Sequence, residues 1–154
     1  MAHFCAIPAD AEAAAPTIGV ALRFLRANNE REIESAFERL SRARADALLV
    51  GPGAFLDSHR DLLVVRAAKM AIPAAYETRA TAVAGGLISY GASVGDGYRQ
   101  AGVYIGRVLN GEKPANLPVL QATKYELIIN LKTAKALGLA IPQTLLLGAD
   151  EIIE

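Results

Sequence analysis

The chain has 154 residues, of which 53% are apolar, and its 16 basic and 16 acidic residues give a formal net charge of zero. A chain of this length and apolar content can bury a core, which argues against a disordered polymer and a scaffold held by disulfide or metal staples. Zero net charge argues against a basic nucleic-acid-binding or membrane-bound surface, and no apolar stretch approaches the roughly 20 residues that span a bilayer.

The first 18 residues are predicted to be an extension ahead of a single α/β domain over residues 19–154. Residues 1–16 contain no lysine or arginine and no sustained hydrophobic run, so they do not resemble a secretory signal. The Ala-rich run at residues 9–15 predicts a short helix that Pro16 ends.

From Gly19 onward, short aliphatic runs alternate with amphipathic stretches of helical length, a pattern typical of an α/β fold with a parallel sheet. Pro73 indicates that the third strand starts there or lies at an edge of the sheet. The five strands are expected at residues 20–25, 47–50, 72–76, 87–90 and 125–129.

Between these strands, polar residues mark the helix starts. Asn29 with Glu32 predicts a capping box, and the helix that follows should bury Ile33, Phe37 and Leu40. Further caps are expected at Ser58, at Ser93 with Asp96, and at Asn130; Leu62, Val65 and Ala68 should share one helix face, and Tyr98, Ala101, Ile105 and Val108 another.

Ligands of open parallel sheets bind outside the carboxyl ends of the strands, where the chain turns into a helix. Aromatic hydroxyls, small residues and one charged pair follow the expected strands, which indicates a small-molecule cleft, although turn geometry alone also favours Gly, Pro and Ser there. The candidates are Gly51, Pro52, Gly53, Phe55, Ser58, Tyr76, Glu77, Arg79, Tyr90, Gly91 and Ser93.

Residues for catalysis are few, so we expect neither an enzyme nor a cofactor. His3 and His59 are the only histidines, and Ser58 and His59, as helix neighbours, point in different directions. No phosphate-binding loop or metal-ligand spacing occurs, and the single Cys5 excludes an internal disulfide. Glu77 and Arg79 could pair with each other or hold the two ends of a zwitterion.

Several motifs occur in an order that resembles the solute-binding proteins of a bacterial ABC-transporter family. They include ADALLV at 45–50, AIPAAYE at 71–77 and AGGLISYG at 84–91. The run KYELIINLKTAKALG at 124–138 is similar to that family's C-terminal signature. The resemblance covers about residues 19–154.

This resemblance implies a type I periplasmic-binding-protein fold, in which two Rossmann-like or flavodoxin-like lobes close on a small solute such as an amino acid. It implies a non-catalytic periplasmic protein that delivers its solute to an ABC permease. The solute itself stays unnamed. By position, the ligand-binding residues would be Gly53, Phe55, Ser58, Tyr76, Glu77, Tyr90 and Gly91.

Family members are about twice as long, so the chain corresponds to a C-terminal half whose last segment would cross to the missing lobe. The helix from Asp96 to Leu109 would then lack its usual partner, and we expect a homodimer or a domain swap through it. The alternative is a stand-alone oligomeric interaction module with a weak ligand or none, cytoplasmic if Met1 is the true start.

Overall fold

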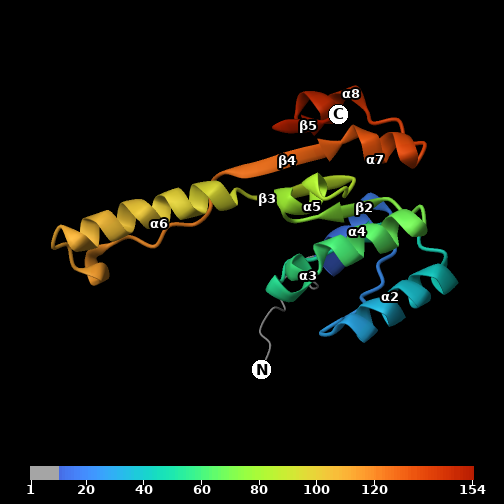
Figure 1. Cartoon of the computed structure of the whole chain (residues 1–154), viewed down its shortest axis with the longest axis horizontal. Coiled ribbons are helices and arrows are strands. Elements are labelled where there is room, and N and C mark those ends of the chain that lie inside the picture. Colours follow the sequence, from blue (N-terminus) through green and yellow to red (C-terminus); the bar gives the residue numbers. More distant parts are fainter. Residues whose placement is uncertain (1–10) are drawn as a thin grey trace. The chain divides into compact units, whose positions relative to one another are not determined.

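The computed structural model describes residues 11–154, which fall into two compact units, one ending at Ala45 and the other spanning Asp46–Glu154 (Figure 1). The predictions for His3, Cys5 and residues 9–10 lie outside the described residues. Among the described residues, no helix combines the length and the hydropathy that a bilayer crossing needs.

In the first unit, residues 11–14 are helical and continue into the 3-10 turn η1 (Ala15–Ile18). The prediction that Pro16 ends this helix was wrong, because Pro16 lies in the first turn of η1, where its φ is compatible and no N–H donor is needed. Gly19 ends the turn instead, with a left-handed φ of 69°.

Helix α2 (Glu30–Ala43) confirms the predicted capping box. The Asn29 side chain accepts a hydrogen bond from the Glu32 N–H at 3.0 Å, and Glu32 accepts one from Asn29 Nδ2 at 2.8 Å. The predicted face of Ile33, Phe37 and Leu40 is buried.

Residues 20–25 were expected to form a strand, and this prediction was wrong. They have no regular secondary structure, and the alternating Val20, Leu22 and Phe24 side chains are 40–47% exposed. Alternation shows only that a segment could line a sheet face, whereas a strand also needs a neighbouring strand to take up its backbone hydrogen bonds.

The second unit contains a sheet in the order β1-β2-β3-β4-β5. Pairing is parallel from β1 to β3 and between β4 and β5, but antiparallel between β3 and β4. Pro73 directly precedes β2, which confirms a strand start. The strands are β1 (Leu48–Leu49), β2 (Ala74–Tyr76), β3 (Ile88–Ala92), β4 (Tyr125–Asn130) and β5 (Glu151–Ile153).

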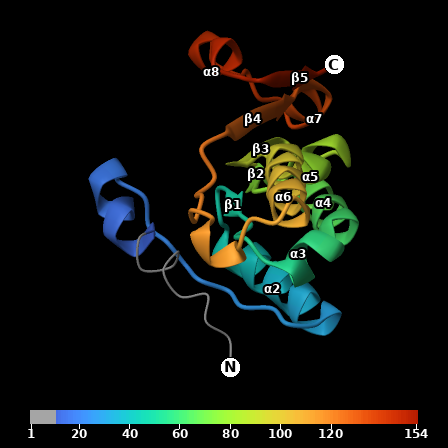
Figure 2. The same cartoon turned by 90° about the vertical axis from the view of Figure 1, so that its left-hand side faces the viewer.

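The antiparallel pair follows from the path of the chain after β3. Helix α6 (Val94–Leu109) leaves the sheet there, and the chain returns beside it through the turn η2 (Pro114–Asn116) (Figures 1 and 2). The Ser93 N–H donates to the Lys124 carbonyl at 2.9 Å where the two segments cross. β4 therefore starts at the end of the sheet that β3 has just left, and can only run in the opposite direction.

Four short helices and a longer one surround the sheet: α3 (Ala54–Ser58), α4 (Arg60–Lys69), α5 (Arg79–Val83), α7 (Leu131–Ala136) and α8 (Gln143–Leu147). Asn130 caps α7 as predicted, accepting from the Thr133 N–H at 3.1 Å. The core includes Leu63, Val64, Ala67, Ile72, Leu87, Ile128 and Ile129.

Two predictions about the second of these helices were wrong. Ser58 does not cap it, because the Ser58 hydroxyl lies inside α3 and donates back to the Phe55 carbonyl at 2.7 Å. Leu63, Val64 and Ala67 form the buried face of α4, while Val65 is 47% exposed. Four consecutive apolar residues at 62–65 fit either register, so periodicity could not choose between them.

Candidate functional site

The turn after β1 carries three of the predicted site residues. Gly53 precedes the first residue of α3, Phe55 is partly buried, and Ser58 is exposed. The Phe55 ring lies 4.3 Å, centroid to centroid, from the His59 ring. The Nδ1 atom of His59 lies 2.8 Å from the Phe55 carbonyl, which can only accept, so Nδ1 carries the proton of this bond.

The segments after β2 and within β3 meet at Gly91. A Cβ atom at Gly91 would collide with the Glu77 carbonyl oxygen and would lie 2.9 Å from Glu77 Cγ. Only glycine leaves room for this approach, which places the Glu77 side chain against β3, one residue from Tyr90.

A second carboxylate, which sequence reasoning missed, lies close to Glu77. Burial, and then the charge of Asp57, raise the pKa of the Glu77 carboxyl. The Thr78 hydroxyl donates to Asp57 Oδ1 at 2.8 Å, so the hydrogen bond of 2.9 Å between Thr78 and Thr81 is donated by Thr81. Asp57 comes soon after the second predicted strand, and this position could have indicated a site residue. The site edge is therefore acidic.

Arg79 pairs with Glu151 and not with Glu77. Its Nε and a terminal nitrogen donate to the two carboxylate oxygens of Glu151 on β5, at 2.6 and 2.7 Å. This bidentate pair joins residues 72 positions apart, so no local pattern could reveal it. The guanidinium is already engaged within the chain.

Tyr76 lies in the interior of the second unit. The residue is 4% exposed, its ring lies against Gly86, and burial raises the pKa of its hydroxyl to about 12. A Cβ at Gly86 would lie 2.8 Å from the ring, so this glycine makes room for Tyr76.

Tyr90 lies next to an aromatic residue that sequence reasoning did not single out. Its ring stacks on Tyr125 of β4 with a centroid distance of 5.8 Å and an interplanar angle of 23°. The two residues are 63% and 51% exposed. The pair offers accessible aromatic surface beside the antiparallel strands.

The Ser93 hydroxyl connects the start of α6 to β4. It accepts from the Asp96 N–H at 3.4 Å, as predicted for the cap, and donates to Glu126 Oε1 at 2.7 Å. Glu126 is paired with Gly91 in the ladder between β3 and β4. The base of α6 is thus bonded to the segment that shapes the site edge.

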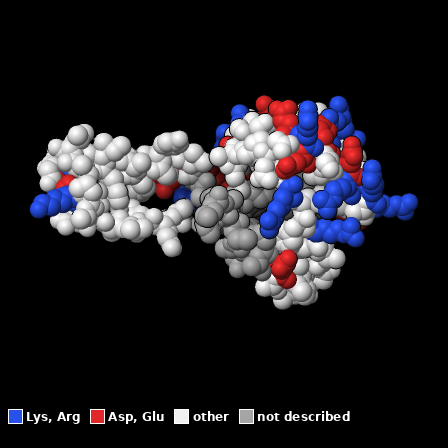
Figure 3. All heavy atoms as spheres, turned by 90° about the horizontal axis from the view of Figure 1, so that it is seen from below, with Lys and Arg blue, Asp and Glu red and all other residues white. Residues whose placement is uncertain are grey.

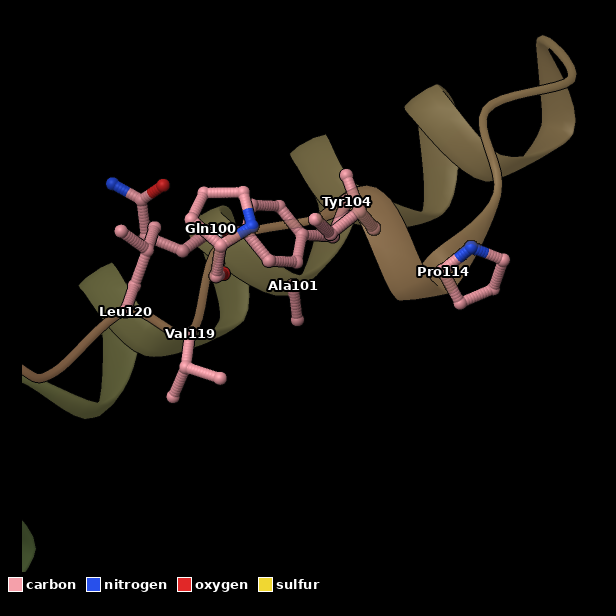
Figure 4. A pocket seen from close by; sticks show the side chains of 8 residues that line it. Gln100, Ala101, Tyr104, Pro114, Val119 and Leu120 are labelled. Carbon is pink, nitrogen blue, oxygen red and sulfur yellow. Dashed lines mark hydrogen bonds between the residues drawn. The ribbon is translucent and has the colours of Figure 1, made fainter.

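Helix α6 and the return segment, residues 114–120, border an open hollow of about 480 Å³ (Figure 4). The Tyr104 hydroxyl donates to the Pro118 carbonyl at 2.6 Å and fixes the return against the helix. The part formed by α6 and the return segment, at the left of Figure 3, carries few charged side chains. The hollow is lined by Gln100, Ala101, Tyr104, Pro114, Leu117, Pro118, Val119 and Leu120.

Over residues 11–154, no group of three or more His, Cys, Asp or Glu side chains is arranged to hold a metal ion.

Comparison with known proteins adds a family and a fold. The family model described as "ABC transporter substrate binding protein" matches residues 10–153. No curated protein matches the chain.

Three solved structures share the fold. A conserved domain protein from Vibrio cholerae has a TM-score of 0.84 at 22% identity, over 95% of this chain and 49% of its own. A Streptococcus ABC domain in complex with L-Trp has a TM-score of 0.83 at 27% identity, over 96% and 52%. An open, ligand-free substrate-binding protein with adhesive properties from Clostridium difficile has a TM-score of 0.64 at 20% identity, over 96% and 48%.

The chain therefore spans about half the length of these proteins. The family model covers nearly all of the chain, and the mixed, mostly parallel sheet agrees with the fold that the resemblance implied. The chain belongs to the ABC transporter substrate binding protein family.

Proposed function

We propose that this chain is the C-terminal lobe of a periplasmic solute-binding protein that delivers its solute to an ABC permease. The proposal rests on one observation above all: Glu77 and Gly91 meet at the carboxyl edge of the sheet, as expected for a ligand site in such sheets. Gly53, Phe55, Ser58 and Tyr90 complete the proposed contact surface. The lobe has no catalytic role in this proposal.

The chemistry of this edge favours an amino acid with an apolar or aromatic side chain. Glu77 and the nearby Asp57 suit an ammonium group, while Phe55 and Tyr90 offer ring surface to an apolar side chain. Arg79 is engaged by Glu151, so the solute carboxylate would bind other groups. The related Streptococcus domain in complex with L-Trp supports this class. Tyr76 is buried, so we leave its side chain out of the proposed solute contact.

The chain contains five tyrosines but no tryptophan, so fluorescence excited selectively at the indole of added L-Trp reports binding. We expect a saturable change with a dissociation constant of roughly 1 mM, because half a cleft encloses little of the solute. Glu77→Gln should weaken binding by about tenfold, the loss of one charged contact. Tyr98→Phe, on exposed α6, is the control that leaves it unchanged.

Two outcomes would contradict this proposal. The absence of a saturable signal up to about 20 mM L-Trp would remove the solute site from this chain and favour the interaction module. Sub-micromolar binding by a monomer would contradict the proposal that this chain supplies only half of the cleft.

We also propose that α6 associates with a second copy of the chain. None of its residues is buried, and Tyr98, Ile105 and Leu109 are 77%, 59% and 82% exposed. All three charged side chains of the helix are paired within the chain, Asp96 with Arg99 and Arg107 with Glu112, and its other side chains carry no charge. Exposed apolar surface of this kind is costly in water and favours association.

Light scattering after size exclusion tests this association. At tens of micromolar we expect a species of twice the 16.2 kDa chain mass, and Ile105→Asp should convert it to monomer. Lys113→Asp, beyond the end of the helix, is the matched control. A monodisperse monomer of the unaltered chain would overturn the association.

A further inference from the structure

A second hollow of about 250 Å³ lies between α4, α7 and the turn that precedes β3. Ile72, Ala74 and Leu87 line it, and these residues lie at the amino ends of β2 and β3. The proposed solute site is at the opposite, carboxyl ends of the same strands. The hollow is therefore a separate place in the fold.

Apolar side chains form the walls of this hollow. Val64, Ala67, Ile72 and Leu87 are between 5% and 8% exposed, so the inner wall belongs to the core, whereas Ala68, Ala71 and Ala136 form an exposed rim. By comparison with a cavity of about 150 Å³ that binds benzene, a molecule of roughly ten heavy atoms fits.

The Tyr76 hydroxyl is an unused donor at this place. The residue lines the hollow and is 4% exposed, and no hydrogen bond joins its hydroxyl to the described part of the chain. Its oxygen is not among the fully buried, unpaired polar atoms of the described residues, so the hydroxyl is accessible from the hollow. Burial raises the pKa of Tyr76 to about 12, so at neutral pH the group is a donor.

The other polar groups around the hollow set the charge of its occupant. Lys132 brings an ammonium group, and no Asp or Glu is among the lining residues. The Thr133 hydroxyl already donates to the Gly85 carbonyl at 2.8 Å. The Tyr76 hydroxyl and the positively charged Lys132 ammonium thus offer two donors, which complement an anionic acceptor.

We propose that this hollow binds a small apolar carboxylate, with its anionic group on the Tyr76 hydroxyl and the Lys132 ammonium and its apolar body against Val64 and Ala136. This site is independent of the proposed solute site at Glu77.

Titration of the ¹⁵N-labelled full chain with sodium benzoate tests the site by NMR. We expect saturating shifts confined to residues 64–76, 84–87 and 131–137, with a dissociation constant near roughly 1 mM. Shifts at residues 53–58 or 90–91 would report the other site, so the two proposals fail separately. Benzyl alcohol, which lacks the charge, should bind about tenfold more weakly.

Four variants test the location of the site. Lys132→Gln should weaken benzoate binding by about tenfold, whereas Lys135→Gln, on the same helix but outside the lining, should leave it unchanged. Ala136→Leu fills the hollow from an exposed position and should abolish binding without unfolding the chain. Tyr76→Phe keeps the ring and should weaken binding several-fold.

Equal losses for the two lysine variants, binding that survives Ala136→Leu, or no saturation by about 20 mM benzoate would each overturn the proposal.

Discussion

Replacing Ser89 with alanine should stabilise this protein, although most substitutions of buried residues destabilise. Ser89 is 1% exposed in the middle of β3, and its hydroxyl has no hydrogen-bond partner among the described residues. It lies in register between Tyr76 of β2 and Ile128 of β4. No solvent reaches the hydroxyl, so its desolvation is uncompensated.

The magnitude follows from two opposing contributions. Removing a buried, unpaired hydroxyl recovers about 1–3 kcal/mol. Losing one oxygen removes a few dispersion contacts of about 0.1–0.2 kcal/mol each, less than about 1 kcal/mol together. We therefore expect Ser89→Ala to raise the free energy of unfolding by about 1–2 kcal/mol, and the urea midpoint by about 0.5–1 M at an m-value near 2 kcal/mol/M.

Ser93→Ala is the matched control, because Ser93 is also a buried serine and lies one residue beyond the same strand. Its hydroxyl makes two hydrogen bonds, to Glu126 and from the Asp96 N–H, so its loss should lower the urea midpoint by a similar amount. Urea unfolding followed by circular dichroism measures both variants. A lower midpoint for Ser89→Ala would refute the reasoning.

Three further predictions concern the site edge and its supports. Gly91→Ala should destabilise by about 1–3 kcal/mol in thermal unfolding, because the new Cβ meets the backbone of Glu77, whereas Gly95→Ala in open space should not. The folded-state pKa of Glu77 lies above its usual 4.5, so the contribution of this group to stability is present below pH 4.5 and falls as pH rises through the folded pKa. The stability of Glu77→Gln relative to the unaltered chain should therefore increase across this pH window. Urea unfolding at several pH values measures this difference. A double-mutant cycle on Arg79 and Glu151 should give a coupling of about 0.5–1 kcal/mol, since both side chains are partly exposed; zero coupling would show that the pair adds nothing.

What could be predicted from the sequence was mostly local. The caps at Asn29, Ser93 and Asn130 were all predicted, because a cap depends on a side chain and an N–H group only three residues apart. The same holds for the end of α6 before Gly111.

What could not be predicted depends on distant partners. Residues 20–25 alternate like a strand, but pairing decides whether a strand forms, and their sequence does not contain it. The direction of the Tyr76 ring depends on the room that Gly86 leaves. The partner of Arg79 comes from the last strand. At the site edge, the residue types were visible in the sequence, whereas the approach of Glu77 to Gly91 required the fold.

The solute edge and the exposed helix are physically linked, although they are different surfaces. Gly91 packs against Glu77 and is paired with Glu126, which accepts the hydrogen bond from the Ser93 hydroxyl that caps α6. A partner that covered α6 would therefore act on the segment that positions Glu77, and a solute bound at the proposed site would act on the start of α6. Linkage is reciprocal, so if association changes solute affinity, solute must change the association constant by the same factor.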